Sequence, residues 1–117
     1  MGAGGPGPRL HADDLGATVE VNAVIGRLLH AGRLVGVSVL ANGPATDEAL
    51  RLLVRHPGVA VHVHVNLTEG RPLTSARDLR PLTAADGRFV GARGAALALA
   101  RGRGDARAIA AEVTAQV

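Results

Sequence analysis

The chain has 117 residues, of which 47% are hydrophobic, and this length allows one small domain. It has no cysteine, which excludes a disulfide framework and a thiolate metal site, and its net charge of +3 comes from scattered arginines. With one Phe, no Tyr and no Trp to stack on bases, the composition argues against nucleic-acid binding. No apolar run is long enough for a membrane span, so we expect a cytoplasmic protein.

The first predicted elements are a short strand and an amphipathic helix. Residues 1–8 are mostly Gly and Pro, so we expect a disordered tail before a single domain over 9–117. Residues 9–12 could form a stub of strand. A helix is predicted after Thr18 and ends at Gly32, because apolar residues recur at helical spacing. This apolar face consists of Val21, Val24, Ile25, Leu28 and Leu29.

A buried strand and a second helix come next. Residues 34–40 form an almost continuous apolar run, which predicts a strand buried on both faces, as in a parallel sheet. The turn sequence Asn42-Gly43-Pro44 follows it. We expect Thr46 to cap a second helix that ends before Pro57.

The segment 59–67 carries the most informative pattern of the chain. Valines on every second residue predict a strand, whose other face carries His62, His64 and Asn66. Imidazole and amide groups in a row are typical of a metal or proton-transfer site. Residues 74–91 are polar and turn-rich, and two helices are expected over 92–100 and 105–117, the second with Ile109 and Val113 on one face.

The order strand, helix, strand, helix, strand predicts βαβ units and a parallel sheet, that is, an α/β fold. In such folds, sites form where strands end. Asp13 and Asp14 follow the first strand, Asn42 the second, and His64 and Asn66 end the third, so we expect them at one rim. A carboxylate and an imidazole together suit a divalent ion such as Zn²⁺ or Mn²⁺.

Simpler interpretations exist for each fragment. An Asp-Asp pair before a helix is often only a turn or an N-cap, and His62 alone is more often a packed histidine than a ligand. Glu69 and Arg71 could pair across a turn.

Four motifs in order identify a more specific resemblance. The chain resembles the YdjC-like carbohydrate deacetylases, which include chitooligosaccharide deacetylases, from about residue 10 to 73 and more weakly beyond. The motifs are His11–Gly16, Val21–Asn22, Asn42–Ala45 and His64–Leu73. The resemblance implies a TIM-barrel-like (β/α) fold of parallel strands, and a divalent-metal hydrolase that removes acetyl groups from N-acetylated oligosaccharides.

The resemblance also implies roles for individual residues. Asp14 and His64 would be ligands of a divalent ion, Mg²⁺ or Zn²⁺, and Asp13 would be the catalytic base. The ion would lower the pKa of a water molecule and polarise the acetamide carbonyl while Asp13 takes the proton. The expected substrate contacts are Asn42, Asn66, Glu69 and Arg71.

Two departures from the family pattern shape our expectation. The last metal-ligand histidine of the family has no counterpart before Val117, and a full barrel needs about 250 residues. We therefore expect about three βα units of a partial barrel whose carboxy-terminal part is missing, a truncated member that is not active alone. His62 could replace the missing ligand, as a His-x-His pair with His64.

Two rival functions remain open. The first is a non-catalytic binding module derived from the same half-barrel, and the second is a basic nucleic-acid binder whose affinity would fall steeply with salt. A half-barrel would expose apolar strand edges, so we expect association with a second copy or with a complementing chain.

Overall fold

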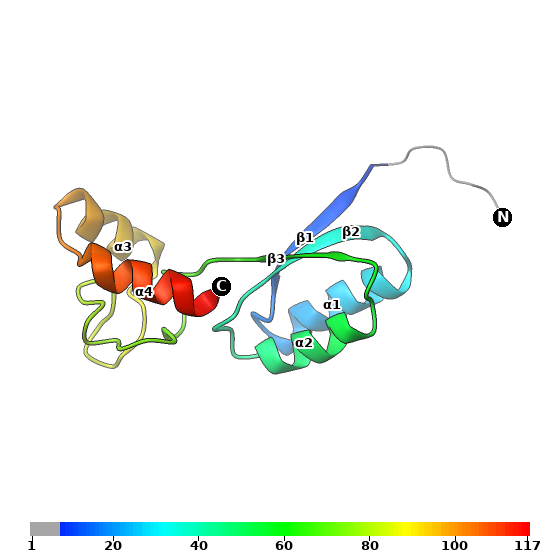
Figure 1. Ribbon diagram of the computed structural model, residues 1–117, viewed down its shortest axis with the longest axis horizontal. Helices are drawn as coiled ribbons and strands as arrows, with labels where there is room; N and C mark the ends of the chain where they lie inside the picture. Colours follow the sequence, from blue (N-terminus) through cyan, green and yellow to red (C-terminus); the bar gives the residue numbers. More distant parts are fainter. Residues whose placement is uncertain (1–7) are drawn as a thin grey trace.

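The computed structural model describes residues 8–117, so the predicted tail over 1–8 lies, except for Pro8, outside the described residues. The described chain is an α/β protein (Figure 1). Its elements are β1 (Leu10–Leu15), α1 (Val19–His30), β2 (Leu34–Val39), α2 (Thr46–Val54), β3 (Ala60–Val63), α3 (Gly91–Ala100) and α4 (Ala106–Gln116).

The three strands form a parallel sheet in the order β1-β2-β3, as the alternation of strands and helices predicts. Both crossover helices, α1 and α2, lie along the same face of this sheet (Figure 1). Because the strands are parallel, their carboxyl ends meet at one rim, which is where the candidate site lies.

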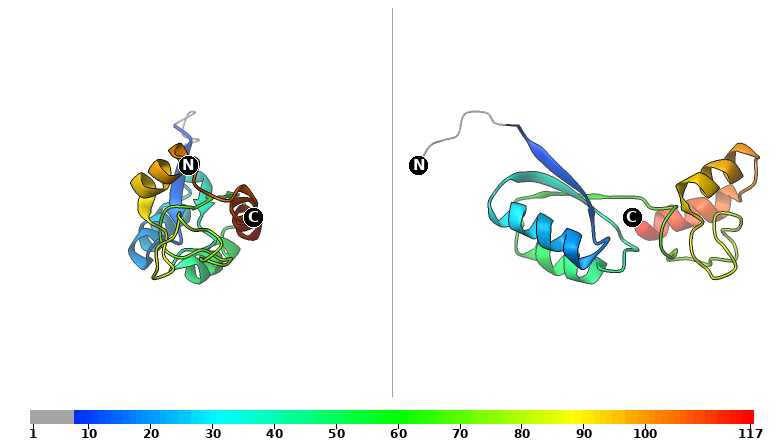
Figure 2. Two further views of the ribbon diagram at one scale, coloured as in Figure 1. Left: turned by 90° about the vertical axis from the view of Figure 1, so that its left-hand side faces the viewer. Right: turned by 180° about the vertical axis from the view of Figure 1, so that it is seen from behind.

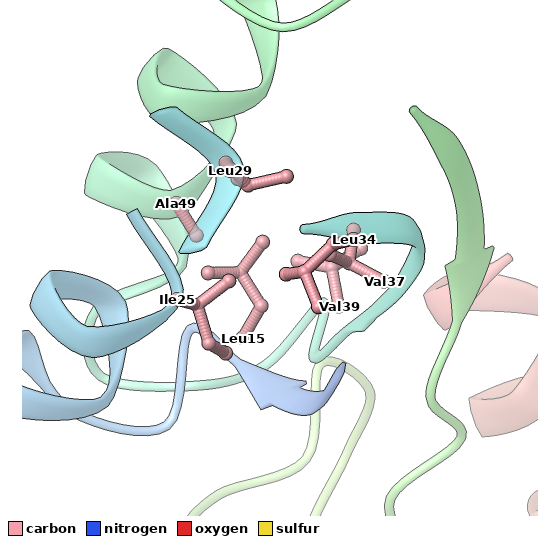
Figure 3. Close-up of a cluster of buried hydrophobic side chains, with 7 residues drawn as sticks. All are labelled: Leu15, Ile25, Leu29, Leu34, Val37, Val39 and Ala49. Atoms are coloured by element: carbon pink, nitrogen blue, oxygen red, sulfur yellow. The ribbon is translucent and has the colours of Figure 1, made fainter. Parts of the chain in front are cut away.

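The core between the sheet and the helices explains the α1 periodicity. Seven buried residues from the sheet and from the two crossover helices pack together, as Figure 3 shows. They are Leu15, Ile25, Leu29, Leu34, Val37, Val39 and Ala49. On α1, Ile25 and Leu29 are buried as predicted, but Val24 is exposed because it lies at the margin of the predicted apolar stripe.

Three local predictions are wrong. β1 is longer than the predicted stub and contains Asp13 and Asp14 instead of ending before them. β2 is not buried on both faces, because Val35 is 43% exposed. β3 ends at Val63, well before Leu67, because the Asn66 side chain accepts backbone hydrogen bonds that turn the chain away from the sheet.

Thr46 also differs from its predicted role as a helix cap. The N-cap of α2 is Ala45, which makes no side-chain capping bond. The Thr46 hydroxyl instead accepts a hydrogen bond from the Gly43 amide and donates to the Leu40 carbonyl. It therefore fastens the loop between β2 and α2 rather than the helix.

The segment after β3 forms a second lobe, so the molecule is elongated, with extents of 56 × 25 × 22 Å (Figure 2). This lobe has its own core of Leu79, Leu82, Phe89, Ala95 and Ala98. The apolar stripe predicted on the last helix forms only part of its buried side: Ile109 packs half-buried against this core, but the buried residues of α4 are Glu112 and Gln116.

Apolar side chains of β3 are exposed. Val61 and Val63 are 51% and 40% exposed. Among residues 8–117, no helix combines the length and the apolar character that a membrane crossing requires.

Candidate metal centre

Asp14 and His64, fifty positions apart in sequence, meet at the carboxyl end of the sheet. The distance between Asp14 Oδ1 and His64 Nδ1 is 3.2 Å. Both side chains remain accessible, with exposed fractions of 60% and 38%. The predicted convergence of these two side chains at one rim is therefore confirmed.

A β-bulge directs Asp14 towards His64. The residue pairs Ala12↔Val37 and Leu15↔Val39 place three steps of β1 opposite two steps of β2. Asp14 takes up the extra residue with a φ of 65°, in the left-handed region that Asp and Asn tolerate better than most residues. This conformation turns the carboxylate out of the regular strand alternation. Backbone strain of this kind often accompanies functional sites.

The competing interpretation of the Asp-Asp pair as an N-cap is wrong. Thr18 caps α1, with its hydroxyl accepting from the Val21 amide at 3.1 Å. The Asp14 carbonyl does accept from the Ala17 amide, so a turn is present, but the Asp14 carboxylate is left free of a capping role.

The environment of His64 Nδ1 fits a cation. This nitrogen is buried and forms no hydrogen bond, because its short distance to Asp14 Oδ1 does not have hydrogen-bond geometry. Ligands at about 2.1 Å around a tetrahedral ion lie roughly 3.4 Å apart, close to the observed separation. Within residues 8–117, no group of three or more His, Cys, Asp or Glu side chains converges in a way that could hold a metal ion.

A cleft of about 400 Å³ opens beside this pair. Its walls come from the loop after β2 and from the segment after β3, and they carry amide, hydroxyl, carboxylate and guanidinium groups. The polar side chains that line it are Asp14, Asn42, His64, Asn66, Thr68, Glu69 and Arg88. All the predicted site residues except Asp13 and Arg71 thus line one cleft.

Asp13 faces a different part of the sheet. Its Oδ1 lies 3.6 Å from His11 Nε2, and it borders a shallower hollow on the α1 side. His11 Nε2 also lies 2.9 Å from the Ser38 hydroxyl, and the ring of His11 packs against that of His62 at a centroid distance of 5.4 Å. His62 is exposed and touches only the His11 ring in this contact, so the packed-histidine interpretation is not supported; whether His62 also binds an ion with His64 stays a prediction.

Gly36 allows His11 to lie across β2. A Cβ at position 36 would approach His11 Nδ1 to 2.8 Å, so any side chain there would displace the imidazole. The contacts of His11 with Ser38 and His62 therefore depend on the absence of a side chain at Gly36 in β2.

Asn42 and Asn66 build the wall of the cleft. Asn66 Nδ2 donates to Asn42 Oδ1 at 3.2 Å and to the Glu69 carbonyl at 2.9 Å. Asn42 Nδ2 donates in turn to the Arg71 carbonyl. The proposed turn pair of Glu69 and Arg71 is not formed, since the Arg71 guanidinium donates to the Asp86 carbonyl at 2.8 Å.

Asn22 ties together the loops that follow β1 and β2. It is buried, its Oδ1 accepts from the Gly16 amide at 2.8 Å, and its Nδ2 donates to the Ala45 carbonyl at 3.0 Å. In the sequence Asn22 stands out only as part of a motif, because nothing local shows which distant backbone groups it bonds.

Comparison with known proteins identifies the family. The family model described as YdjC-like protein matches residues 9–117. The chain belongs to the YdjC-like family.

The relatives of this YdjC-like chain carry consistent names. A carbohydrate deacetylase of Homo sapiens is 36% identical over 107 residues, covering 91% of this chain and 33% of that protein. A carbohydrate deacetylase of Geobacillus stearothermophilus is 40% identical over 82% of this chain and 37% of that protein. The YdjC-like chain thus spans about a third of the length of these curated relatives.

A solved structure supports the fold. A protein of Enterococcus faecalis V583, provisionally named for cellobiose-phosphate cleavage, superimposes with a TM-score of 0.77 and 22% identity. The match covers 93% of the YdjC-like chain and 41% of that chain.

Two residues of the YdjC-like chain contact the site segment and were missed by the sequence patterns. Glu112 accepts hydrogen bonds from the Leu73 amide, the Thr74 amide and hydroxyl, and Gln116. Burial raises the pKa of Glu112, but the hydrogen bonds from Thr74, Gln116 and the backbone outweigh it, so the pKa lies below its ordinary value. The only sequence signal was the i, i+4 spacing of two polar residues.

Proposed function

We propose that this chain provides part of the active site of a divalent-metal-dependent deacetylase that removes acetyl groups from N-acetylated carbohydrates. The observation that carries the proposal is the 3.2 Å approach of Asp14 Oδ1 to a His64 Nδ1 that is buried and forms no hydrogen bond. A carboxylate oxygen and an imidazole nitrogen that lie this close without hydrogen bonding to each other form a pair of donors suited to a divalent cation. The names of the curated relatives support the carbohydrate substrate.

The roles of the residues follow from this pair. Asp14 and His64 would hold the ion, Mg²⁺ or Zn²⁺, which when bound supplies Lewis acidity that lowers the pKa of water and polarises an acetamide carbonyl. Asp13 would take the proton from the attacking water as general base, which requires its carboxylate to turn from His11 towards the cleft. Its carboxylate is 66% exposed, next to Asp14 on the same bulge, and the nearby His11 would restrict its orientation.

The cleft has the character of a sugar site. Its volume of about 400 Å³ is within the usual range for small-molecule sites of roughly 300–1,000 Å³. Asn42, Asn66 and Glu69 are among the residues that line it, and a lining of such polar residues suits a ligand rich in hydroxyl groups. Arg71 would act indirectly, since its carbonyl holds the Asn42 amide.

The proposal includes a larger (β/α) barrel around this sheet. Catalytic zinc usually has three protein ligands, so at least one ligand beyond Asp14 and His64 is required. A complete barrel, or a complementing chain, would supply it and would cover the exposed Val61 and Val63. The length of the relatives, about three times the matched portion, supports this view.

The test is a zinc titration by calorimetry, combined with an assay of acetate release from N-acetylated chitooligosaccharides. The assay uses a version of the chain extended to full barrel length. We expect Asp14→Asn and His64→Ala to lose zinc affinity and acetate release together. Asp13→Asn is the matched control, because it should keep the zinc affinity but lose acetate release. Equal zinc affinity in the wild type and both ligand variants would overturn the proposal.

A non-catalytic binding module is the second candidate. The observation in its favour is that residues 8–117 bring together only two ligands. This alternative predicts that the extended chain binds zinc and chitooligosaccharides but releases no acetate.

A further inference from the structure

The end of α4 is joined to the strand segment that carries His64. Gln116 Oε1 accepts from the Asn66 amide at 2.8 Å, and Gln116 Nε2 donates to the Asn66 carbonyl at 2.7 Å. One side-chain amide therefore satisfies both backbone groups of one residue. A neighbouring β-strand would make the same pair of bonds.

The contact between Gln116 and Asn66 lies two residues after the candidate metal ligand His64. β3 is an edge strand among the described residues, and its ladder to β2 ends at Val63. His64 keeps one bond, from its amide to the Val39 carbonyl. Beyond His64 the sheet provides no further ladder, so Gln116 fixes the backbone two residues after the candidate ligand.

Glu112 holds the far end of the loop formed by residues 66–74, which begins at Asn66. Its two carboxylate oxygens accept from the amides of Leu73 and Thr74, each at 2.8 Å. Gln116 Nε2 also donates to Glu112 Oε1 at 2.9 Å, so the two side chains, one helical turn apart, form one unit. Both are buried, with exposed fractions of 0% and 4%.

The loop between these two anchors forms one wall of the cleft. Asn66, Thr68, Glu69 and Gly70 all line it. Inside the loop the Asn66 side chain accepts from the amides of Thr68 and Glu69. The shape of the wall therefore depends on where Asn66 is held.

We propose that Gln116, supported by Glu112, is a positioning residue that sets the orientation of His64 and of the 66–74 loop, and thereby the affinity of the candidate metal centre. This inference rests on the proposed function for its metal readout. It adds a residue of the last helix, 50 positions away from Asn66, to the determinants of the site.

A purely structural role is the competing explanation. In that case loss of Gln116 would lower the stability of the protein but leave the folded molecules with an unchanged site. The experiment must therefore measure the site itself as well as stability.

The test compares Gln116→Met with Thr114→Val in the full chain. Methionine matches glutamine in length but cannot form the hydrogen bonds to Asn66. Thr114→Val is the matched control, because it removes one hydrogen bond of the same helix, from the Thr114 hydroxyl to the Ala110 carbonyl, without touching the loop. Zinc affinity is measured by calorimetry, and the ring-proton chemical shifts of His64 are measured by NMR without metal.

We expect Gln116→Met to weaken zinc binding about tenfold to a hundredfold, the usual effect of removing a partner that orients a metal ligand. Its His64 ring shifts should change as well, while Thr114→Val should retain both wild-type values. Unchanged affinity and unchanged His64 shifts in Gln116→Met would overturn the inference, even if its stability falls.

Two further results keep the proposals distinguishable. If neither the wild type nor the version extended to full barrel length binds zinc but the His64 shifts still respond to Gln116→Met, the metal proposal fails and the positioning role stands. If Gln116→Met does not fold, hydrogen exchange of the wild-type Asn66 amide decides. We expect strong protection of this amide, and exchange at the rate of an unstructured peptide would refute the role of Gln116.

Discussion

Substitution of Gly43 by alanine probes how tightly the loop after β1, which contains Gly16, packs against the loop after β2, which contains Gly43. A Cβ at position 43 would lie 2.2 Å from the Gly16 carbonyl oxygen and 2.8 Å from its carbonyl carbon. Both contacts are with backbone, which cannot rotate away as a side chain can. The two loops would have to separate by about 1 Å to restore ordinary van der Waals contact.

The loss of folding free energy can be estimated from the overpacking and from the one backbone hydrogen bond that this separation would break. Overpacking costs about 1–3 kcal/mol, and one lost backbone bond adds about 1 kcal/mol. The bond most exposed to the shift runs from the Ala45 amide to the Gly16 carbonyl at 2.9 Å. We therefore expect Gly43→Ala to lower the free energy of unfolding by about 2–4 kcal/mol.

Urea denaturation followed by circular dichroism measures this change. With an m value of roughly 1–2 kcal/mol/M for a domain of this size, the midpoint should fall by more than 1 M. Gly58→Ala is the matched control, because a Cβ there meets no atom within 4 Å and neither glycine has a positive φ. The control should be neutral or stabilised by about 0.5 kcal/mol. Equal midpoints for the two variants would refute the packing argument.

Three further predictions concern Asp14, Glu112 and Phe89. Asp14→Gly should raise the urea midpoint, because glycine adopts a φ of 65° without the cost of roughly 1 kcal/mol, yet it should abolish zinc binding in a titration. The pKa of Glu112 is lowered in the folded state, so its stabilising contribution should be full above its ordinary value of 4.5 and disappear as the pH falls further. Melting curves from pH 7 to 3 should therefore show a steeper loss for the wild type than for Glu112→Gln. Phe89→Ala should cost about 3 kcal/mol in urea unfolding because Phe89 is buried in the second core, whereas Val90→Ala, at an exposed position, should cost less than about 1 kcal/mol.

Local patterns predicted most of the sheet and helix layer. The spacing of Ile25 and Leu29 identified the buried face of α1, and the apolar run around Val37 identified the central strand. These predictions succeed because the 3.6-residue and 2-residue periods of apolar side chains follow directly from helix and strand geometry. The end of β3 was predicted too late because the Asn66 side chain accepts from the amides two and three residues further on, a local competition with the sheet that apolar periodicity does not register.

Residues that act through distant backbone groups could not be predicted. Glu112 and Gln116 look like ordinary surface positions of a helix, yet they are its buried residues. Their partners lie 39 and 50 positions away, and no local rule relates such positions. The last helix therefore shows the limit of pattern analysis.

The sequence alone determined the α/β class, the parallel direction of the strands and the family of this chain, because periodicity and motif spacing are local properties that do not depend on the final packing. Tertiary structure alone decided how the site is built. A bulge with a left-handed Asp14 turns its carboxylate towards His64, and α4 holds the loop beside them. The physical reason is that side-chain direction at a rim depends on backbone conformation and on long-range hydrogen bonds, which form only when the whole chain is folded.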